Sequence, residues 1–167
     1  MKLLLLAAFI ISFSTNTALS PAPPKVDFSG TWSLDKAASE NIPPQILDQT
    51  LIIKQTGDRI DVQAKITTDQ GEETIPDTII VDGKQNDFTP RGHGGLKGTG
   101  KRTAKWTEDG KGVQSEEDAT FDTPNGAITI HATRTISLSP DGKTLTMLQT
   151  IKTDQGEQKI KRVYVKK

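Results

Sequence analysis

Hydrophobic and polar residues alternate along most of the chain after residue 28, a pattern typical of half-buried β-strands. Threonine, valine and isoleucine are frequent there, and β-branched side chains favour extended structure. The alternation predicts strands over 29–35, 47–56, 59–68, 73–81, 84–88, 99–107, 112–121, 127–138, 144–153 and 158–166. In segment 127–138 the isoleucines share one face, which is expected to point inward, and Arg134 lies on that face.

Turn signals separate these strands. Asp-Gly and Asn-Gly pairs supply the positive φ angles that tight hairpins need, as at 82–83, 109–110, 125–126 and 141–142. The pentapeptide Thr-Asp-Gln-Gly-Glu occurs at 68–72 and again at 153–157, which we interpret as one hairpin turn used twice. Consecutive strands joined by tight turns form an antiparallel meander, and closure into a barrel removes its exposed edges.

We therefore predict an all-β fold, a single antiparallel up-and-down β-barrel of eight to ten strands with its first and last strands adjacent. The best helix candidate is 35–46, but Pro43-Pro44 limits it to at most one short helical turn after the first strand.

The first twenty residues have the layout of a secretory signal peptide. Lys2 is followed by an apolar stretch over 3–11 that is too short to cross a bilayer, and then by small or polar residues. A Pro-rich leader over 21–26 and a barrel domain over 27–167 complete the predicted organisation. These features predict an exported protein, either periplasmic or secreted, with no membrane span in the mature chain.

Composition narrows the possible function classes. About 147 residues remain after the signal, enough for one domain with its own core. The chain has no cysteine, which excludes disulfides, thiolate metal sites and cysteine nucleophiles. Its 21 basic residues balance 21 acidic ones, so no bulk charge attracts nucleic acid. We expect a monomer.

One glycine-rich segment matches a phosphate-binding spacing. Gly95 to Lys101 reads Gly-x-x-x-x-Gly-Lys, but Arg102 stands where Ser or Thr would hold magnesium, and the following segment is strand-like. We interpret 89–100 as a loop between strands.

Other catalytic and metal patterns are weak. His93 and His131 have neither a second histidine nor a carboxylate at ligand spacing, so no metal site is predicted. The acidic run 116–118 is typical of an exposed strand face. Without a nucleophile elbow or a Ser-His-Asp set, the sequence predicts neither an enzyme nor a cofactor.

Arg134 is a candidate binding residue. A guanidinium among apolar inward-facing neighbours requires a counter-charge, which an internal carboxylate or a bound anion can supply. Alternatively, the strand lies near a barrel rim and Arg134 extends to solvent.

The octet Asp27-Phe28-Ser29-Gly30-Thr31-Trp32-Ser33-Leu34 resembles the opening strand of the calycin barrels, the lipocalins and fatty-acid-binding proteins. Together with Ser139-Pro140-Asp141-Gly142-Lys143-Thr144-Leu145-Thr146, it is also similar to small exported bacterial lipocalin-like domains. The resemblance implies structural roles for Gly30 and Trp32 where the barrel begins. The gap between the first two strands is too short for the two-helix lid of fatty-acid-binding proteins.

The ending Arg162-Val163-Tyr164 resembles the last strand of fatty-acid-binding proteins, where an Arg and a Tyr hold the ligand carboxylate. The resemblance implies two roles for Arg162. It stacks on Trp32, as an arginine does in calycin barrels, or it binds a ligand with Tyr164 and Arg134.

The functional prediction is an exported binding protein for a small, partly apolar ligand, such as a fatty-acid-like carboxylate, held inside the barrel. The alternative is a solid-core barrel that acts as an interaction or inhibitor module through its loops, without a small-molecule ligand. Interior volume distinguishes the two, because a ligand site needs roughly several hundred Å³.

Overall fold

A computed structural model describes residues 24–91, 96–124 and 126–167 of the chain. The signal peptide predicted over 1–20 and the first half of the leader lie outside these residues, so their boundaries stay predictions. Among the described residues, no helix has the length and apolar character needed to span a membrane.

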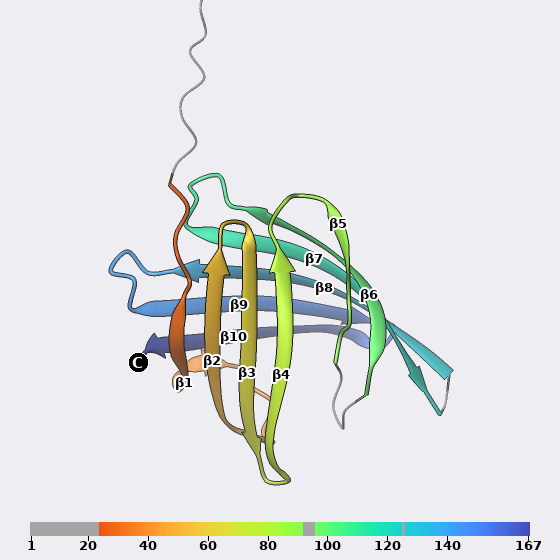
Figure 1. The fold of residues 1–167 in the computed structure, drawn as a ribbon. Coiled ribbons are helices and arrows are strands. Elements are labelled where there is room, and N and C mark those ends of the chain that lie inside the picture. Colours follow the sequence, from red (N-terminus) through yellow and green to blue (C-terminus); the bar gives the residue numbers. More distant parts are fainter. Residues whose placement is uncertain (1–23, 92–95, 125) are drawn as a thin grey trace, which may run out of the picture.

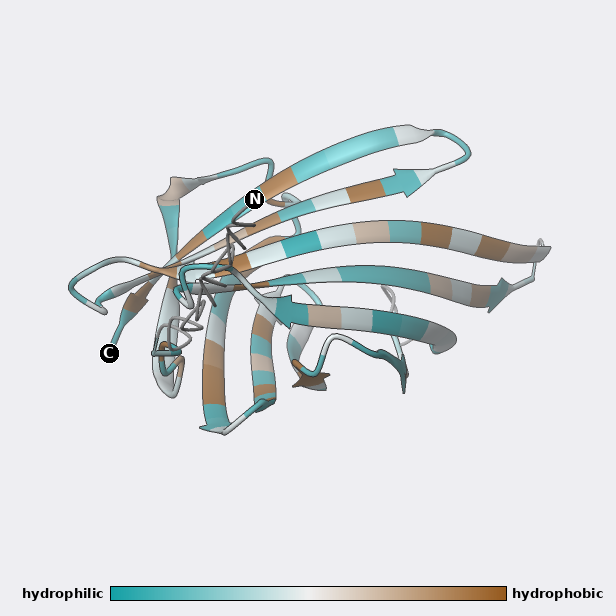
Figure 2. Cartoon of the chain, turned by 90° about the horizontal axis from the view of Figure 1, so that it is seen from above, coloured by the Kyte–Doolittle hydropathy of each residue, from teal (hydrophilic) through white to brown (hydrophobic). Residues whose placement is uncertain are grey.

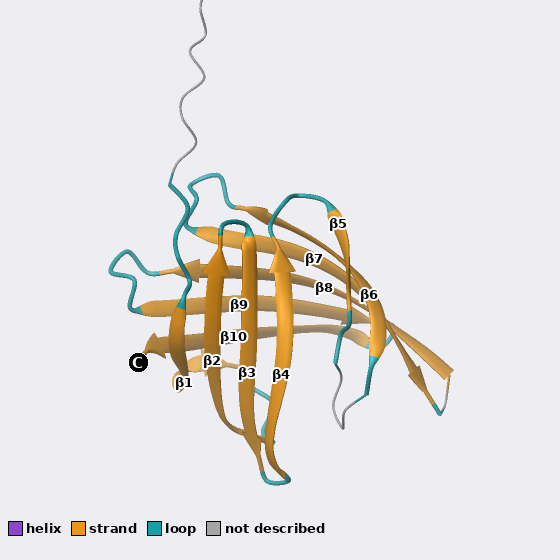
Figure 3. Ribbon diagram, viewed as in Figure 1, coloured by secondary structure: helices purple, strands orange, loops and turns teal. Residues whose placement is uncertain are grey.

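Antiparallel strands make up the fold (Figures 1 and 3). They are β1 (Gly30–Glu40), β2 (Ile46–Thr56), β3 (Arg59–Thr68), β4 (Gly71–Ile80), β5 (Gln85–Phe88), β6 (Gly98–Trp106), β7 (Gly112–Thr123), β8 (Gly126–Leu138), β9 (Thr144–Thr153) and β10 (Gly156–Lys166). Each overlaps the range that the sequence predicts, and the all-β prediction is confirmed.

The strands form a 10-stranded sheet in the order β4-β3-β2-β1-β10-β9-β8-β7-β6-β5. β1 pairs with both β2 and β10, so the first and last strands are adjacent, as predicted. Strands β2, β3 and β4 run across β7 to β10, and the two layers enclose the core (Figure 1). The sheet ends at β4 and β5, and within the described strands no backbone ladder joins these two. We call this break in the barrel the seam.

The segment 35–46, for which the sequence allows at most one short helical turn, contains none: it forms the second half of β1 and the connection to β2. No described residue is helical, and the strand continues to Glu40. Its register to β10 shifts between Asp35 and Glu40. There Ser39 Oγ donates to the Asp35 carbonyl at 2.6 Å and accepts the amide of Val163 at 2.9 Å. A serine hydroxyl thus keeps the irregular strand attached to β10.

The turns form as their sequences predict. Gly142 has φ 67°, and the amide of Lys143 donates to the Asp141 carboxylate at 3.1 Å. In both copies of the repeated pentapeptide, the amide two residues after the threonine donates to its hydroxyl at 3.2 Å, from Gln70 and from Gln155. The repeated sequence is therefore one hairpin turn used twice.

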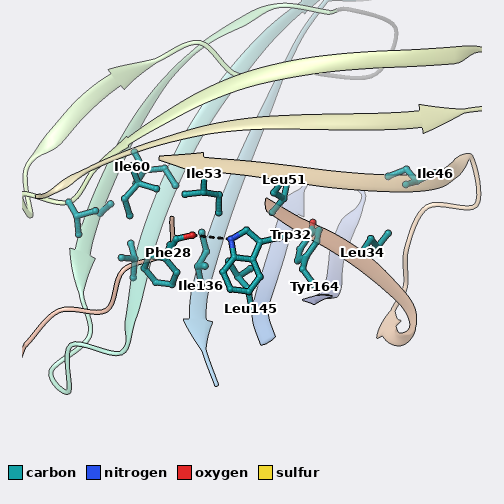
Figure 4. Close-up of a cluster of buried hydrophobic side chains, with 14 residues drawn as sticks. Phe28, Trp32, Leu34, Ile46, Leu51, Ile53, Ile60, Ile136, Leu145 and Tyr164 are labelled. Carbon is teal, nitrogen blue, oxygen red and sulfur yellow. Dashed lines mark hydrogen bonds between the residues drawn. The ribbon is translucent and has the colours of Figure 1, made fainter. Parts of the chain in front are cut away.

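Hydrophobic and hydrophilic residues alternate along the strands, and the inward-facing hydrophobic ones build the core (Figure 2). Its centre lies around Trp32 and Tyr164, which are fully buried (Figure 4). Trp32 Nε1 donates to the Phe28 carbonyl at 2.9 Å, which satisfies the indole inside the core. We call this end of the barrel the floor.

Lys166, not Arg162, lies over the indole of Trp32. The two are paired across β1 and β10, and the Lys166 ammonium is 5.1 Å from the centre of a Trp32 ring. Gly30 makes room for this lysine: it has φ 143°, and a Cβ there would lie 2.9 Å from Lys166 Cε. The stacking of Arg162 on Trp32 is therefore a wrong prediction, because the register of β10 places Arg162 further along the strand.

Residues ahead of β1 close the floor. The amide of Val26 donates to the Gly110 carbonyl at 3.0 Å, and Gln55 bonds both the Val26 carbonyl and the Phe28 amide. The Phe28 ring stacks on Trp106 with their centroids 6.1 Å apart. The opening segment thus folds across the barrel end before it enters the sheet.

Candidate ligand site inside the barrel

The structure brings the three predicted binding residues together inside the barrel. Arg134 lies on β8, and Arg162 and Tyr164 lie on β10, with β9 between the two strands. Tyr164 is fully buried and the Arg134 side chain is 16% exposed. The positive charge of Arg134 acts on both Arg162 and Tyr164, which reflects how near the three groups lie.

Tyr164 is a neutral hydrogen-bond donor. Burial raises its pKa to about 12, so the hydroxyl keeps its proton at neutral pH. That hydroxyl donates to Gln49 Oε1 at 3.0 Å. Gln49 is itself buried, on β2 across the barrel.

Arg134 pairs with carboxylates inside the barrel and does not extend to solvent at a rim. Its Nη2 lies 3.4 Å from Glu117 Oε2, and its Nη1 lies 3.8 Å from Asp77 Oδ2. Its Nε is buried without a hydrogen-bond partner. Because the Glu117 contact is long and the Asp77 contact exceeds hydrogen-bond distance, Arg134 retains capacity to bind another acceptor.

Arg102 is the most completely paired cation in this region, and the sequence did not single it out as a site residue. It makes two bonds to Asp77, at 2.9 and 3.0 Å, and one to Glu117 at 3.0 Å. Burial disfavours its charge, but the two carboxylates outweigh burial and raise the pKa of Arg102. Its guanidinium also lies 4.2 Å from the Phe88 ring centroid.

Glu117 corrects the prediction that the acidic run 116–118 forms an exposed face. Glu116 and Asp118 are exposed, but Glu117 points inward and is 6% exposed. The signal was available, because Glu117 shares the period-two face of β7 with Val113 and Phe121.

Arg162 has no carboxylate partner among the described residues. Its Nη1 donates to Gln149 Oε1 at 3.2 Å, and its Nε is buried without a partner. Burial lowers the pKa of Arg162, and the charge of Arg134 lowers it further. Even so, a guanidinium stays protonated in proteins, so Arg162 is a half-buried cation whose charge no described carboxylate neutralises.

Together Asp77, Arg102, Glu117, Arg134 and Arg162 form what we call the charged layer, with three cations and two anions. It has one positive charge in excess. One further negative charge, such as that of a bound monoanion, would balance this excess.

Between the charged layer and the floor lies a cavity of about 40 Å³. It is lined by Phe28, Leu51, Ile53, Ile60, Val62, Asp77, Ile79, Arg134, Ile136, Leu145 and Met147. Arg134 and Asp77 are its charged members, and its remaining walls are apolar. The cavity is far smaller than the roughly 300 Å³ that a ligand site usually needs.

On the other side of the charged layer, away from the floor, inward-facing positions are small or apolar. Ala119 and Ala132 are buried there, and Ile130 and Ile151 are half-buried. Ile128, near the end of β8, is 47% exposed. We call this part of the barrel the mouth.

Metal chemistry has no evident site. Among residues 24–91, 96–124 and 126–167, no group of three or more metal-ligating side chains occurs. His131 pairs with the Asp118 carboxylate at 2.8 Å on the exposed face of β7 and β8. This cross-strand carboxylate was not expected from the sequence spacing. His93 lies outside the described residues.

Comparison with solved structures finds a similar barrel. The zebrafish ileal bile acid-binding protein, complexed with cholic acid, has a TM-score of 0.51 and 21% identity to this chain. The match covers 84% of this chain and 98% of that one. No family model matches the chain, and no curated protein matches it. The comparison shows a calycin-like fold, which confirms the resemblance predicted from the sequence.

Proposed function

We propose that this protein binds one small amphipathic molecule with a single carboxylate inside its barrel. The observation that carries the proposal is the excess cation of the charged layer, Arg162, which is half-buried near Arg134, has a buried Nε without a partner and has no carboxylate of its own among the described residues. A carboxylate is the partner that a guanidinium binds best, through two parallel hydrogen bonds. The zebrafish bile acid-binding protein has the same fold and is complexed with cholic acid, itself an amphipathic carboxylic acid.

Charged and neutral side chains both donate hydrogen bonds to the ligand carboxylate in this proposal. The unpartnered Nε atoms of Arg134 and Arg162 are the available charged donors. Tyr164 adds a neutral hydroxyl that is already held in place by Gln49. The apolar part of the ligand contacts the isoleucines of the mouth, which bind by burial of hydrocarbon surface.

Binding requires the interior to open, because the cavity near Arg134 is only about 40 Å³. Met147, which lines this cavity, is a flexible side chain that adopts other rotamers at low cost. Ligand binding should therefore be slow compared with binding to a preformed cavity, and its rate should depend on motion of the barrel.

Native mass spectrometry and thermal unfolding test this proposal with the chain from residue 21 onward. We expect oleate or cholate to bind with one-to-one stoichiometry and to raise the melting temperature, whereas oleyl alcohol has a much smaller effect. Arg162→Gln should weaken binding of the carboxylate about tenfold to a hundredfold, the equivalent of one charge-assisted hydrogen bond. Arg91→Gln is the matched control, because Arg91 is exposed and lies away from the residues of the charged layer.

The proposal fails if no carboxylate appears in the native mass spectrum and none changes the melting temperature. It also fails if Arg91→Gln and Arg162→Gln weaken binding equally. We further propose that the protein is a monomer exported through its signal peptide. N-terminal sequencing of the mature protein and its mass in solution test these two points.

A second function is favoured by the small cavity itself. A barrel filled by its own side chains can act as an interaction or inhibitor module through its loops. The glycine-rich loop 89–100 is the candidate contact, although residues 92–95 lie outside the described part of the chain. A protein that purifies from its native host without a small molecule, but with a stoichiometric protein partner lost on deletion of 92–95, would support this function and contradict ligand binding.

A further inference from the structure

Side chains close the seam where the backbone ladder is missing. Arg102 of β6 reaches across to β4, where it bonds the Asp77 carboxylate twice and the Thr78 carbonyl at 3.0 Å. Nearer the floor, the amide of Gly83 donates to the Ala104 carbonyl at 2.9 Å. The Arg102 side chain is only 5% exposed, so its bonds to β4 are shielded from water.

A groove of about 440 Å³ follows the outside of the seam, where β4 and β5 stand apart (Figure 1). It is lined by Arg59, Pro76, Asp77, Thr78, Ile80, Asn86, Asp87, Phe88, Thr89 and Arg102. The volume is within the range of sites for small organic molecules. Phe88, Ile80 and Pro76 offer apolar surface in it, beside the guanidinium groups of Arg59 and Arg102.

Asp77 lines both the outer groove and the inner cavity. The ion pair of Asp77 with Arg102 therefore lies between the groove outside the barrel and the arginine of the inner cavity, Arg134. Asp77 also lies 3.8 Å from Arg134, on the inner side. An anion that binds Arg134 competes with Asp77 for it.

We propose that the outer groove is the site where an amphipathic carboxylate first docks, and that the Asp77–Arg102 pair is a latch through which it enters the barrel. This inference rests on the proposed function and adds its route of entry. The ligand passes through the seam, between β4 and the sheet edge formed by β5 and β6. Among the described residues, Arg102 bonds Asp77 and Thr78 across it, and one backbone bond joins Gly83, which follows β4, to Ala104 near the floor. The ligand does not have to pass along the mouth.

Stopped-flow kinetics with an anthroyloxy-labelled stearate test the latch. In Asp77→Asn we expect both the association and the dissociation rates to rise about tenfold, the equivalent of one lost charge-assisted hydrogen bond in the barrier. Asp87→Asn is the matched control: Asp87 lines the same groove but is exposed and pairs with Lys101 on its own side of the seam. Its rates should equal those of the wild type.

The dissociation rate of Asp77→Asn distinguishes a latch from simple competition between Asp77 and the ligand for Arg134. If Asp77 only competes with the ligand for Arg134, its neutralisation slows dissociation, and the latch is refuted. Unchanged dissociation refutes it as well.

A cross-link across the seam gives a second test. Pro76 and Thr89 are exposed on opposite sides of the groove, and the chain has no cysteine of its own. Pro76→Cys/Thr89→Cys joined by a flexible bis-maleimide should bind and release the labelled stearate at least about tenfold more slowly than the same variant without the linker. Equal rates with and without the linker would show that the ligand enters elsewhere.

Hydrogen exchange tests the latch without any ligand. Amides of β4 should exchange faster in Asp77→Asn than in Asp87→Asn, whereas amides of β8 and β9 should not change. If the wild type binds no labelled stearate, the proposed function fails, and exchange alone decides the latch. Equal exchange of β4 in the two variants would overturn it.

Discussion

Replacing Arg162 by methionine should stabilise the ligand-free protein while it weakens carboxylate binding at least as much as Arg162→Gln does. The side chain is a half-buried cation whose Nε is buried; it has one neutral hydrogen bond, to Gln149, and no carboxylate partner among the described residues. Burial of an unpaired ion costs several kcal/mol even after relaxation. Methionine fills a similar volume without that cost.

Two opposing effects set the size of the change in stability. Removal of the guanidinium recovers the desolvation cost but leaves Gln149 without its partner, which costs about 1 kcal/mol. We expect a net gain of about 1–2 kcal/mol in the free energy of unfolding, or about 3–6 °C in the melting temperature of a domain of this size.

Arg102→Met is the matched comparison, because the same substitution removes a cation with a complete set of partners. In that variant Arg134 is the one cation left to pair with both Asp77 and Glu117. Breaking a buried ion pair costs about 3–5 kcal/mol. The two variants should therefore change stability in opposite directions.

Urea unfolding, monitored by circular dichroism, measures the free energy of unfolding of both variants. The comparison is valid if this free energy depends on urea concentration with the same slope in each. If Arg162→Met lowers the free energy of unfolding by more than about 1 kcal/mol, then the charge of Arg162 is compensated in the folded protein. In that case the excess of one cation, and the argument for an anionic ligand, is wrong.

Three further predictions concern other parts of the barrel. Trp32→Ala should cost about 3–5 kcal/mol in urea unfolding because the fully buried indole anchors the floor, and a loss below about 1 kcal/mol would contradict that role; Trp106→Ala, at a half-buried position, should cost less. Tyr164 is the single tyrosine, and burial raises its pKa from 10.0 to about 12; the free energy of unfolding should therefore be complete below pH 10.0 and fall as pH rises from there toward about 12. Phenolate absorbance reports this group directly, and Tyr164→Phe should remove the loss, so an identical alkaline profile in that variant would disprove the assignment. Hydrogen bonds from Lys25 and then Trp106 lower the pKa of Asp58 below 3.8, so the stability it contributes is present above that pH and is lost as pH falls below it. Asp58→Asn should flatten the acid limb of the stability profile, and an unchanged limb would show that this interaction at the floor contributes nothing.

Local sequence accounts for much of the fold. The strands follow from period-two alternation and the turns from Asp-Gly and Thr-Asp-Gln-Gly, because both depend on residues a few positions apart. At 35–40 the sequence left open at most one short helical turn, and the structure shows strand. There the amide of Val163, more than a hundred residues away, donates to Ser39 Oγ and joins this part of β1 to β10.

The candidate site was predicted in part. Inward placement of Arg134 follows from alternation, and Arg162 and Tyr164 were found through the family resemblance. Glu117 was missed because the charge of its two neighbours was given more weight than its place on the inward face of β7. Asp77 was missed because only the closing of the barrel places β4 near Arg102.

The octet around Trp32 shows which features follow from the sequence and which depend on the tertiary structure. The sequence by itself determined that a barrel strand begins there, that its tryptophan is an anchor, and that an arginine and a tyrosine lie two residues apart on the last strand. Tertiary structure decided which cation covers the tryptophan, because the register between β1 and β10 places Lys166 opposite Trp32 and turns Arg162 toward Gln149. It also decided which carboxylates neutralise which guanidinium groups. Strand register is fixed by pairing between distant segments, and a shift of one residue reverses every side chain, so these interactions cannot be read from any single strand.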